Sequence, residues 1–258
     1  MAETAGAHPR TGMVRVAHVM GMPISLDLAD DLPAAELERL ADLVFDWLRE
    51  VDERFSTYKS TSEISRFARH ELDLESCSPD VRLVLDRSAD LWTRTNGYFD
   101  IHASGALDPS GFVKGWAVQE ASDRLWTAGS RNHCVNAGGD IAVRGGPRPG
   151  EPWRIGIRHP WQPMAVSWVL AVTDRAVATS GTYERGQHII DPFTGLPATE
   201  LVSVTVVGPE LATTDAFATA ALAMGLSGLD WLASLEGYES AAITEDGRAF
   251  RSDNLPVA

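Results

Sequence analysis

Hydrophobic and polar residues recur with two periods along this chain, and each period predicts a different kind of element. Residues 33–51 carry leucine, valine and tryptophan at spacings of three and four, which predicts an amphipathic helix with Pro33 in its first turn. The same period follows Ser78 and predicts a second helix that ends at Asn96 and Gly97. Residues 13–28 instead alternate around a Met-Gly-Met-Pro break, as two short strands meeting at a bend would.

The rest of the chain continues this mixture. A helix is expected after Gly111 to about residue 129, a small-residue helix from Thr213 and a short one over residues 229–235. Residues 134–141 are expected to form a strand, a glycine turn at Gly138 and Gly139, and a second strand. Further strands are expected over residues 153–157, 166–172 and 201–207, and two around Asp246 and Gly247. The pattern predicts an α+β (mixed α/β) domain over residues 13–258, with an antiparallel-rich sheet and packed helices, after a flexible tail of residues 1–12. The Gly/Pro-rich residues 144–152 are expected to form a surface loop inside it.

Size and charge limit the function classes. With 258 residues, 44% of them hydrophobic, the chain can bury a substantial core. The formal charge of −14, from 36 acidic and 22 basic residues, argues against nucleic acid or an anionic membrane as a partner. An acidic protein that binds a phosphate ligand needs a local cation, and a divalent metal ion would serve.

Cysteine usage and the N-terminal residues bear on location. Cys77 and Cys134 fit no metal-binding spacing, so two free thiols in a reducing compartment are expected. The N-terminal residues lack the apolar core of a signal peptide, and no apolar run approaches the length that spans a bilayer. We therefore expect a cytoplasmic protein.

The stretch from Ala178 to Pro197, ATSGTYERGQHIIDPFTGLP, is the chemically richest part of the chain. Thr179, Ser180 and Gly181 are interpreted as a small-residue turn, whose backbone N–H groups and hydroxyls could hold phosphate oxygens. The alternative is a strand, a loop and a second turn.

Two further segments place charged side chains near the starts of predicted helices, where they could bind a ligand or a metal ion. Lys114 lies between two glycines at the start of a helix, so its ammonium and free helix N–H groups face one direction, although the spacing is not that of a P-loop. Asp215 and Thr219 are four residues apart, so they project from the same helix face and can share one hard cation. The structural alternatives are a solvated lysine and an aspartate that serves the helix dipole.

Together these segments resemble the ApbE family, the FAD:protein FMN transferases, from about Met20 to Gly225. The resemblance rests on Met-Gly, FSTY with SEIS, GYFD, DPSGFVKG, NAGGD, TSG with HIIDPFTG, and DAFAT, in the family's order. The chain departs from the family pattern at Met22, Gln119 and Thr214.

The resemblance implies a role for each matched residue. The flavin nucleotide would be contacted by Met20, Tyr58, Tyr98, Phe99, Asp100, Asp108, Lys114, Gly138, Gly139, Asp140, Thr179, Ser180, Gly181 and Ile190. Mg²⁺ would be bound by the main-chain oxygen of Gly111, by Asp215 and by Thr219, and His188 would be the catalytic base. From the residues alone, Met20 could be a core methionine, Tyr58 could cover a helix end and Asp100 could cap a turn.

The implied reaction is transfer of FMN from FAD to a Ser/Thr hydroxyl of an acceptor flavoprotein, leaving a phosphoester link and releasing AMP. The expected partners are FAD, Mg²⁺ and an acceptor with an FMN-binding Ser/Thr motif, with no nucleic acid and no membrane. Two alternatives stay open: an FAD pyrophosphatase that gives FMN and AMP, and a non-catalytic flavin carrier.

Overall fold

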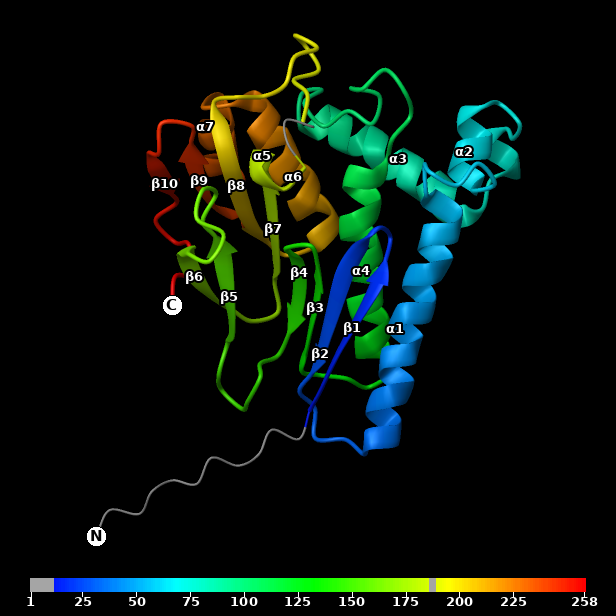
Figure 1. Cartoon of the computed structure of the whole chain (residues 1–258), viewed down its shortest axis with the longest axis vertical. Coiled ribbons are helices and arrows are strands. Elements are labelled where there is room, and N and C mark those ends of the chain that lie inside the picture. Colours follow the sequence, from blue (N-terminus) through cyan, green and yellow to red (C-terminus); the bar gives the residue numbers. More distant parts are fainter. Residues whose placement is uncertain (1–11, 186–188) are drawn as a thin grey trace.

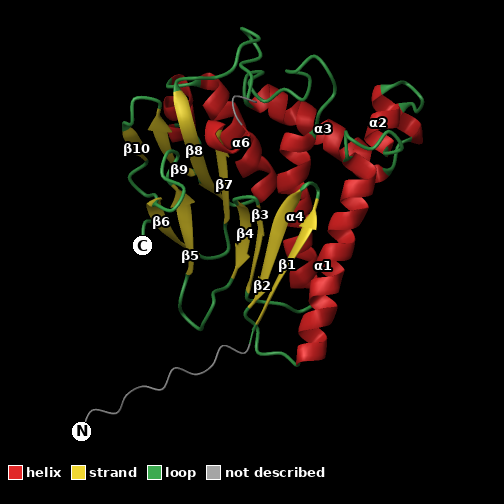
Figure 2. Cartoon of the chain, viewed as in Figure 1, coloured by secondary structure: helices red, strands yellow, loops and turns green. Residues whose placement is uncertain are grey.

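The structure, a computed structural model, describes residues 12–185 and 189–258 of the chain. The expected tail of residues 1–12 therefore lies outside the described residues, apart from Gly12. Figure 1 shows helices α1 and α4 beside the hairpin of β1 and β2, with β5 and β6 at the far side of the sheet. Figure 2 shows the same division between helices and strands, so the predicted mixture of the two is confirmed.

The strands and helices have these bounds. The strands are β1 (Met13–Val19), β2 (Met22–Leu28), β3 (His133–Ala137), β4 (Asp140–Arg144), β5 (Trp153–Arg158), β6 (Val166–Val172), β7 (Ala176–Gly181), β8 (Leu201–Gly208), β9 (Glu239–Thr244) and β10 (Ala249–Arg251). The helices are α1 (Ala34–Phe55), α2 (Glu63–Ala68), α3 (Pro79–Arg94), α4 (Ser110–Thr127), α5 (Thr182–Arg185), α6 (Leu211–Met224) and α7 (Ser227–Ala233), with a 3₁₀ turn at Leu74–Ser76.

Within the described residues, eight strands form one sheet in the order β1-β2-β3-β4-β7-β8-β9-β10, and β5 pairs with β6 in a separate hairpin. Every neighbouring pair in both sheets is antiparallel. The sheet follows chain order except where the β5–β6 hairpin is inserted between β4 and β7. The predicted antiparallel character is therefore confirmed.

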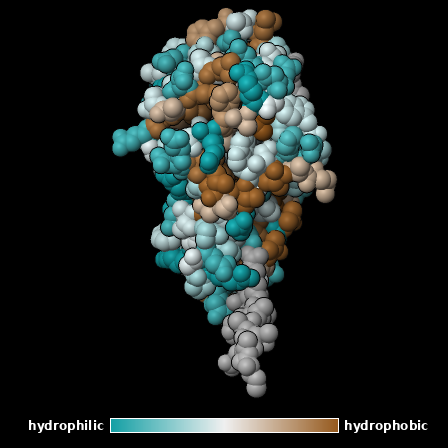
Figure 3. All heavy atoms as spheres, turned by 90° about the vertical axis from the view of Figure 1, so that its left-hand side faces the viewer, coloured by the Kyte–Doolittle hydropathy of each residue, from teal (hydrophilic) through white to brown (hydrophobic). Residues whose placement is uncertain are grey.

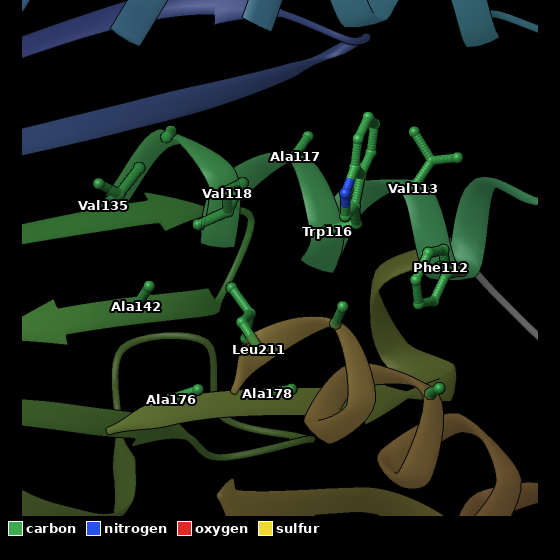
Figure 4. Close-up of a cluster of buried hydrophobic side chains, with 14 of the residues drawn as sticks. Phe112, Val113, Trp116, Ala117, Val118, Val135, Ala142, Ala176, Ala178 and Leu211 are labelled. Carbon is green, nitrogen blue, oxygen red and sulfur yellow. The ribbon is translucent and has the colours of Figure 1, made fainter. Parts of the chain in front are cut away.

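The two faces of the large sheet bury different cores. Alternate residues of β7 show this: Ala176 and Ala178 belong to the core shared with the helices, whereas Val177 belongs to the core shared with β5 and β6. Figure 4 shows α4 and Leu211, at the start of α6, beside the strands that carry Ala142, Ala176 and Ala178. In the same view Trp116 points away from these strands, and its ring packs against rings of α1. Small strand residues let both helices lie close to the sheet.

Helix boundaries agree with their sequence signals. Ser78 caps α3 by accepting a hydrogen bond from the Val81 N–H at 3.4 Å, directly before the predicted second helix. Ser62 caps α2 in the same way, through the Ser65 N–H at 3.2 Å. Helix α1 runs one turn beyond the predicted helix of residues 33–51, because Phe55 continues its buried face.

The segment Thr179-Ser180-Gly181 forms the end of β7 and not a turn, so that interpretation was wrong. Thr179 lies opposite Thr205 and Gly181 lies opposite Ser203 in the ladder with β8. The alternative, a strand, a loop and a second turn, is correct for the strand, although the short helix α5 and not a loop follows β7 directly. Small polar residues suggested a turn, but in the middle of this sheet they leave room for the helix packed above them.

A buried polar cluster lies at the start of β3. His133 is fully buried, and its ring nitrogens lie 2.8 Å from Ser122 Oγ and 3.0 Å from Ser130 Oγ. The Ser130 hydroxyl donates to Asp30 at 2.5 Å, and the carboxylate of Asp30 also accepts from the backbone N–H groups of residues 131 and 132. Burial lowers the pKa of His133 to about 4.

The side of the molecule that carries β6, β10 and the C-terminus exposes some apolar side chains. Figure 3 shows apolar and hydrophilic residues interspersed on this side, and Val166, Phe250 and Val257 are among the exposed apolar residues of these segments. No helix in residues 12–185 and 189–258 has the length and apolar character needed to cross a bilayer.

Candidate functional site

Three charged side chains from three distant segments meet beside the central strands. Lys114 lies in the second turn of α4, Asp140 begins β4, and Asp215 lies in the second turn of α6. The Lys114 Nζ contacts Asp140 Oδ2 directly and lies 3.8 Å from Asp215 Oδ1. Both carboxylates are buried, with 1% and 2% of their side chains exposed, against 24% for Lys114. We call these three residues the charged cluster.

Charge and donor type indicate what the charged cluster can bind. Two carboxylates and one ammonium sum to one negative charge in a buried place, which favours an added cation. The nearby donors are oxygen atoms, which hard divalent cations prefer. Among the described residues, no three His, Cys, Asp or Glu side chains gather as an all-protein metal cage would need. A cation here would therefore also need hydroxyl, carbonyl, water or ligand oxygens.

The other two predicted metal ligands lie on the same helices as members of the charged cluster. Thr219 follows Asp215 by one turn of α6, and its hydroxyl lies 3.0 Å from Ser180 Oγ on β7. Gly111 is the second residue of α4, one turn before Gly115, and the ring of Phe99 lies against it. The structure thus brings Asp215, Thr219 and Ser180 together, and it places Gly111 on the helix that carries Lys114.

Gly115 sets the distance between α4 and α6. A Cβ added at this glycine would lie 2.9 Å from the Leu211 carbonyl oxygen and 3.0 Å from Asp215 Cβ. A real Cβ essentially never lies under 3.0 Å from another heavy atom, so glycine at this position allows the two helices to approach closely. This contact brings Lys114 within reach of Asp215.

Two tight hairpins end beside the same part of the sheet. Met20 and Gly21 join β1 to β2, and Gly138 and Gly139 join β3 to β4; all four have positive φ, from 56° to 101°. Such two-residue loops match the type I′ geometry that the sheet twist favours. The Met22 Sδ lies 3.5 Å from the place where a Gly138 Cβ would be, so the two loops are neighbours. Met20 itself packs against the core, as the structural alternative for it predicted.

A second group of predicted residues forms the loops above α4. Tyr98 packs against Phe193 with ring centroids 4.8 Å apart, which joins the segment at residues 97–108 to the segment at residues 189–197. Asp100 accepts the His102 N–H at 2.8 Å and Asp108 accepts the Ser110 N–H at 3.0 Å. Both carboxylates therefore stabilise their own turns, which for Asp100 is the structural alternative.

The remaining predicted residues have varied surroundings. Thr179 donates its backbone N–H to Asp140 Oδ1 at 3.0 Å, but its hydroxyl lies 2.9 Å from that of Thr205, on the sheet face away from Asp140. Ile190 forms an isolated bridge with Pro197. Tyr58 is 99% exposed in the connection between α1 and α2, so it does not cover the helix end. His188, the predicted base, lies outside the described residues.

Gln119 has a role that sequence analysis missed. Its Oε1 accepts the Leu211 N–H at 2.9 Å, and its amide nitrogen donates to Asp123 at 3.1 Å. Gln119 therefore caps the first turn of α6 from a neighbouring helix, which no local pattern indicates. The contact of Phe193 with Tyr98 was also not predicted, although an aromatic residue inside the segment from Ala178 to Pro197 was a usable signal.

Comparisons with known proteins agree on one family. A family model described as the ApbE family matches residues 20–106 and 101–242. An FAD:protein FMN transferase of Vibrio cholerae serotype O1 is 29% identical over 237 residues, which is 69% of this chain and 71% of the relative. One from Rhodobacter capsulatus is 35% identical over 158 residues, 58% of this chain but only 30% of that longer relative.

Solved structures show the same fold. The flavin transferase ApbE from Vibrio cholerae superposes with a TM-score of 0.84 at 26% identity, covering 95% of this chain and 98% of that one. The ApbE protein from Thermotoga maritima also gives a TM-score of 0.84, over 94% of this chain and 97% of that one. Its 20% identity makes this a likeness of fold alone. The predicted fold class is confirmed.

Proposed function

The chain belongs to the ApbE family, and we propose that it transfers FMN from FAD to the hydroxyl group of a serine or threonine in an acceptor flavoprotein, releasing AMP. The names of its relatives, FAD:protein FMN transferase, support the transfer of a flavin nucleotide. The observation that carries the proposal is the contact of Lys114 with Asp140 beside Asp215, since a phosphate-transfer site needs both a cation and a place for a metal ion.

The described residues fit a divalent cation of the Mg²⁺ type. Asp215 offers a buried carboxylate, Thr219 offers a hydroxyl one turn later, and Gly111 is the candidate carbonyl donor. Few protein ligands suffice, because Mg²⁺ keeps several waters and accepts phosphate oxygens. When bound, the cation would supply positive charge to the pyrophosphate while its bridge breaks. Lys114 would add a fixed positive charge for the phosphate oxygens.

The chemical step exchanges one phosphorus–oxygen bond for another. The acceptor oxygen forms a bond to the FMN phosphorus, the bridging bond breaks, and AMP leaves with the electron pair of that bond. We propose that His188 accepts the hydroxyl proton, because an imidazole titrates near neutral pH. Tyr98 and Phe193, whose rings contact each other, would offer aromatic surface to a flavin or an acceptor segment.

An intact-mass measurement tests the function. The protein, FAD, Mg²⁺ and an acceptor flavoprotein are incubated together, and the acceptor is then weighed. A mass increase equal to FMN, with AMP in equal amount, is expected. Free FMN and AMP with an unchanged acceptor would instead show the pyrophosphatase, and bound FAD without AMP would show a carrier.

A pair of variants separates the base from the cation site. Asp215→Asn should abolish AMP release in Mg²⁺, and His188→Ala should do so while cation binding is unchanged. Asp46→Asn is the matched control, because Asp46 lies on α1 with 69% of its side chain exposed. Full activity in His188→Ala would overturn the base assignment alone.

The cytoplasmic location also stays a prediction, which cell fractionation would test.

A further inference from the structure

Asp140 has both carboxylate oxygens engaged inside the protein. Its Oδ1 accepts the Thr179 N–H at 3.0 Å, and its Oδ2 contacts the Lys114 ammonium. Only 1% of the side chain is exposed. The family resemblance implies that Asp140 contacts the flavin nucleotide directly. A carboxylate that is held by the backbone of β7 and by a lysine from α4 is poorly placed to do so.

The Lys114 ammonium lies near two carboxylates, those of Asp140 and Asp215. Its Nζ contacts Asp140 and lies 3.8 Å from Asp215 Oδ1, beyond hydrogen-bond distance. A lysine side chain is long and flexible, so a small rotation would bring the ammonium onto Asp215. The backbone N–H of Thr179 fixes the Asp140 carboxylate in place, and the Lys114 ammonium contacts this carboxylate and not that of Asp215.

An ammonium resting on Asp215 would compete with a metal ion for the same oxygen atoms. We infer that Asp140 is a positioning residue, which holds the Lys114 ammonium on its own carboxylate and so keeps it from competing with a divalent cation for the oxygen atoms of Asp215. This inference rests on the cation site of the proposed function. A purely structural Asp140 would affect folding stability without any specific effect on cation binding.

Lysine NMR tests the pairing in the unmodified protein. The chain has only two lysines, Lys59 and Lys114, so ¹⁵N-lysine labelling gives two ammonium signals. Lys59 pairs with Asp52 and Glu53 and is the internal reference. In metal-free protein, we expect the Lys114 ammonium hydrogens to exchange slowly, and to stay slow when Mg²⁺ is added, because the ammonium remains on Asp140. Fast exchange of the Lys114 hydrogens after Mg²⁺ is added would mean that the metal displaces the ammonium, which overturns the inference.

Mn²⁺ binding, measured by electron paramagnetic resonance without FAD, tests the consequence. Asp140→Asn keeps an oxygen for the Thr179 N–H but removes the charge that holds Lys114. We expect the ammonium to move to Asp215 and the Mn²⁺ dissociation constant to rise at least tenfold. Lys114→Met in the Asp140→Asn background should then restore Mn²⁺ affinity to within about threefold of the original protein.

A double-mutant cycle distinguishes positioning from a general effect of net charge. If Asp140 positions Lys114, then Lys114→Met strengthens Mn²⁺ binding at least fivefold more in the Asp140→Asn background than in the original protein. Equal factors in both backgrounds would mean that the charges act independently, and the inference would be wrong. Thermal unfolding of each variant shows whether it folds, and the lysine NMR decides the question if Asp140→Asn does not.

The two proposals fail differently. If the original protein binds no Mn²⁺, the cation site of the proposed function is wrong, whatever Asp140 does. If it binds Mn²⁺ through Asp215 and Asp140→Asn binds equally well, the cation site stands and only the positioning role is wrong. Asp46→Asn, which removes an exposed carboxylate, should leave Mn²⁺ affinity unchanged in either case.

Discussion

At the scale of single residues, His133 shows how burial links protonation to stability. The ring is enclosed between Ser122 and Ser130, and its desolvation favours the neutral form, so its pKa falls to about 4. An unfolded chain would have a histidine pKa of about 6.5. Below that pH the unfolded state takes up a proton that the folded state does not bind, so acid favours unfolding.

We therefore predict that His133 contributes a loss of stability of about 2 kcal/mol between pH 7 and pH 5, reaching about 3 kcal/mol near pH 4. The contribution is absent well above pH 6.5. Urea unfolding of the original protein and of His133→Gln at pH 7 and pH 5 measures it. The variant should lose about 2 kcal/mol less over this range; an equal loss in both proteins would show that His133 is not responsible.

Gly115 carries a second prediction at this scale. Gly115→Ala would put a methyl group 2.9 Å from the Leu211 carbonyl oxygen, so α4 and α6 must separate. We expect a loss of about 1–3 kcal/mol in the free energy of unfolding. We also expect weaker Mn²⁺ binding, because the proposed ligand Gly111 on α4 moves away from Asp215 and Thr219 on α6. The control is Ala128→Gly, which changes the C-terminal end of α4, away from its contact with α6. Gly129→Ala would not serve as a control, because Gly129 has a positive φ that alanine adopts only with strain. Unchanged Mn²⁺ affinity in Gly115→Ala would contradict the predicted link between helix spacing and the site.

At the scale of elements, helix α6 depends on contacts at its first turn. Glu210 accepts the N–H groups of Ala212 and Thr213, each at 3.0 Å, and Gln119 of α4 accepts the Leu211 N–H at 2.9 Å. These contacts satisfy N–H groups that a helix start would otherwise leave without partners. They also fix the first turn of α6, one turn before Asp215. Helix α6 is thus held in register by its own cap and by a side chain from α4.

Replacing Gln119 by methionine keeps the size of the side chain but removes the acceptor for the buried Leu211 N–H. We predict a loss of about 1–3 kcal/mol, the cost of leaving a buried donor unsatisfied. Chemical unfolding of Gln119→Met measures this, with Gln162→Met in the exposed loop between β5 and β6 as a control that should change little. Equal stability of the two variants would show that this cap is unimportant.

At the scale of the whole molecule, the candidate site lies where several segments meet. Two hairpin loops, the end of β7 and the facing turns of α4 and α6 converge beside the charged cluster. A ligand that binds only this assembled arrangement stabilises the folded chain by mass action. Cation and flavin nucleotide should therefore act together on thermal stability.

We predict that FAD at a hundred times its dissociation constant, with Mg²⁺ present, raises Tm by about 5–10 °C. Removing Mg²⁺ with a chelator should reverse much of this increase, and Asp215→Asn should lose the part that depends on Mg²⁺. Differential scanning fluorimetry follows all three conditions, with Asp46→Asn expected to behave as the original protein. A rise in Tm that is independent of Mg²⁺ would argue against a shared site.

Most helices and tight turns could be predicted from the sequence alone. Helices α1 and α3, the hairpins at Met20 and Gly138, and the family itself could be predicted, because side-chain periodicity, caps and glycine positions act between near neighbours. The segment at Thr179 was misjudged because its strand conformation depends on β8, which follows some twenty residues later. Local propensity alone could not include that pairing.

The sequence by itself determined which residues were available for chemistry: Lys114, Asp140 and Asp215 all stood in recognisable motifs. Only the tertiary structure decided what each of them contacts, because residues 114, 140 and 215 are brought together by the packing of α4 and α6 on the sheet. Asp140 thereby faces a lysine inside the protein, and Tyr58 faces solvent. Electrostatic contacts depend on distance in space, and sequence spacing does not give that distance for segments so far apart along the chain.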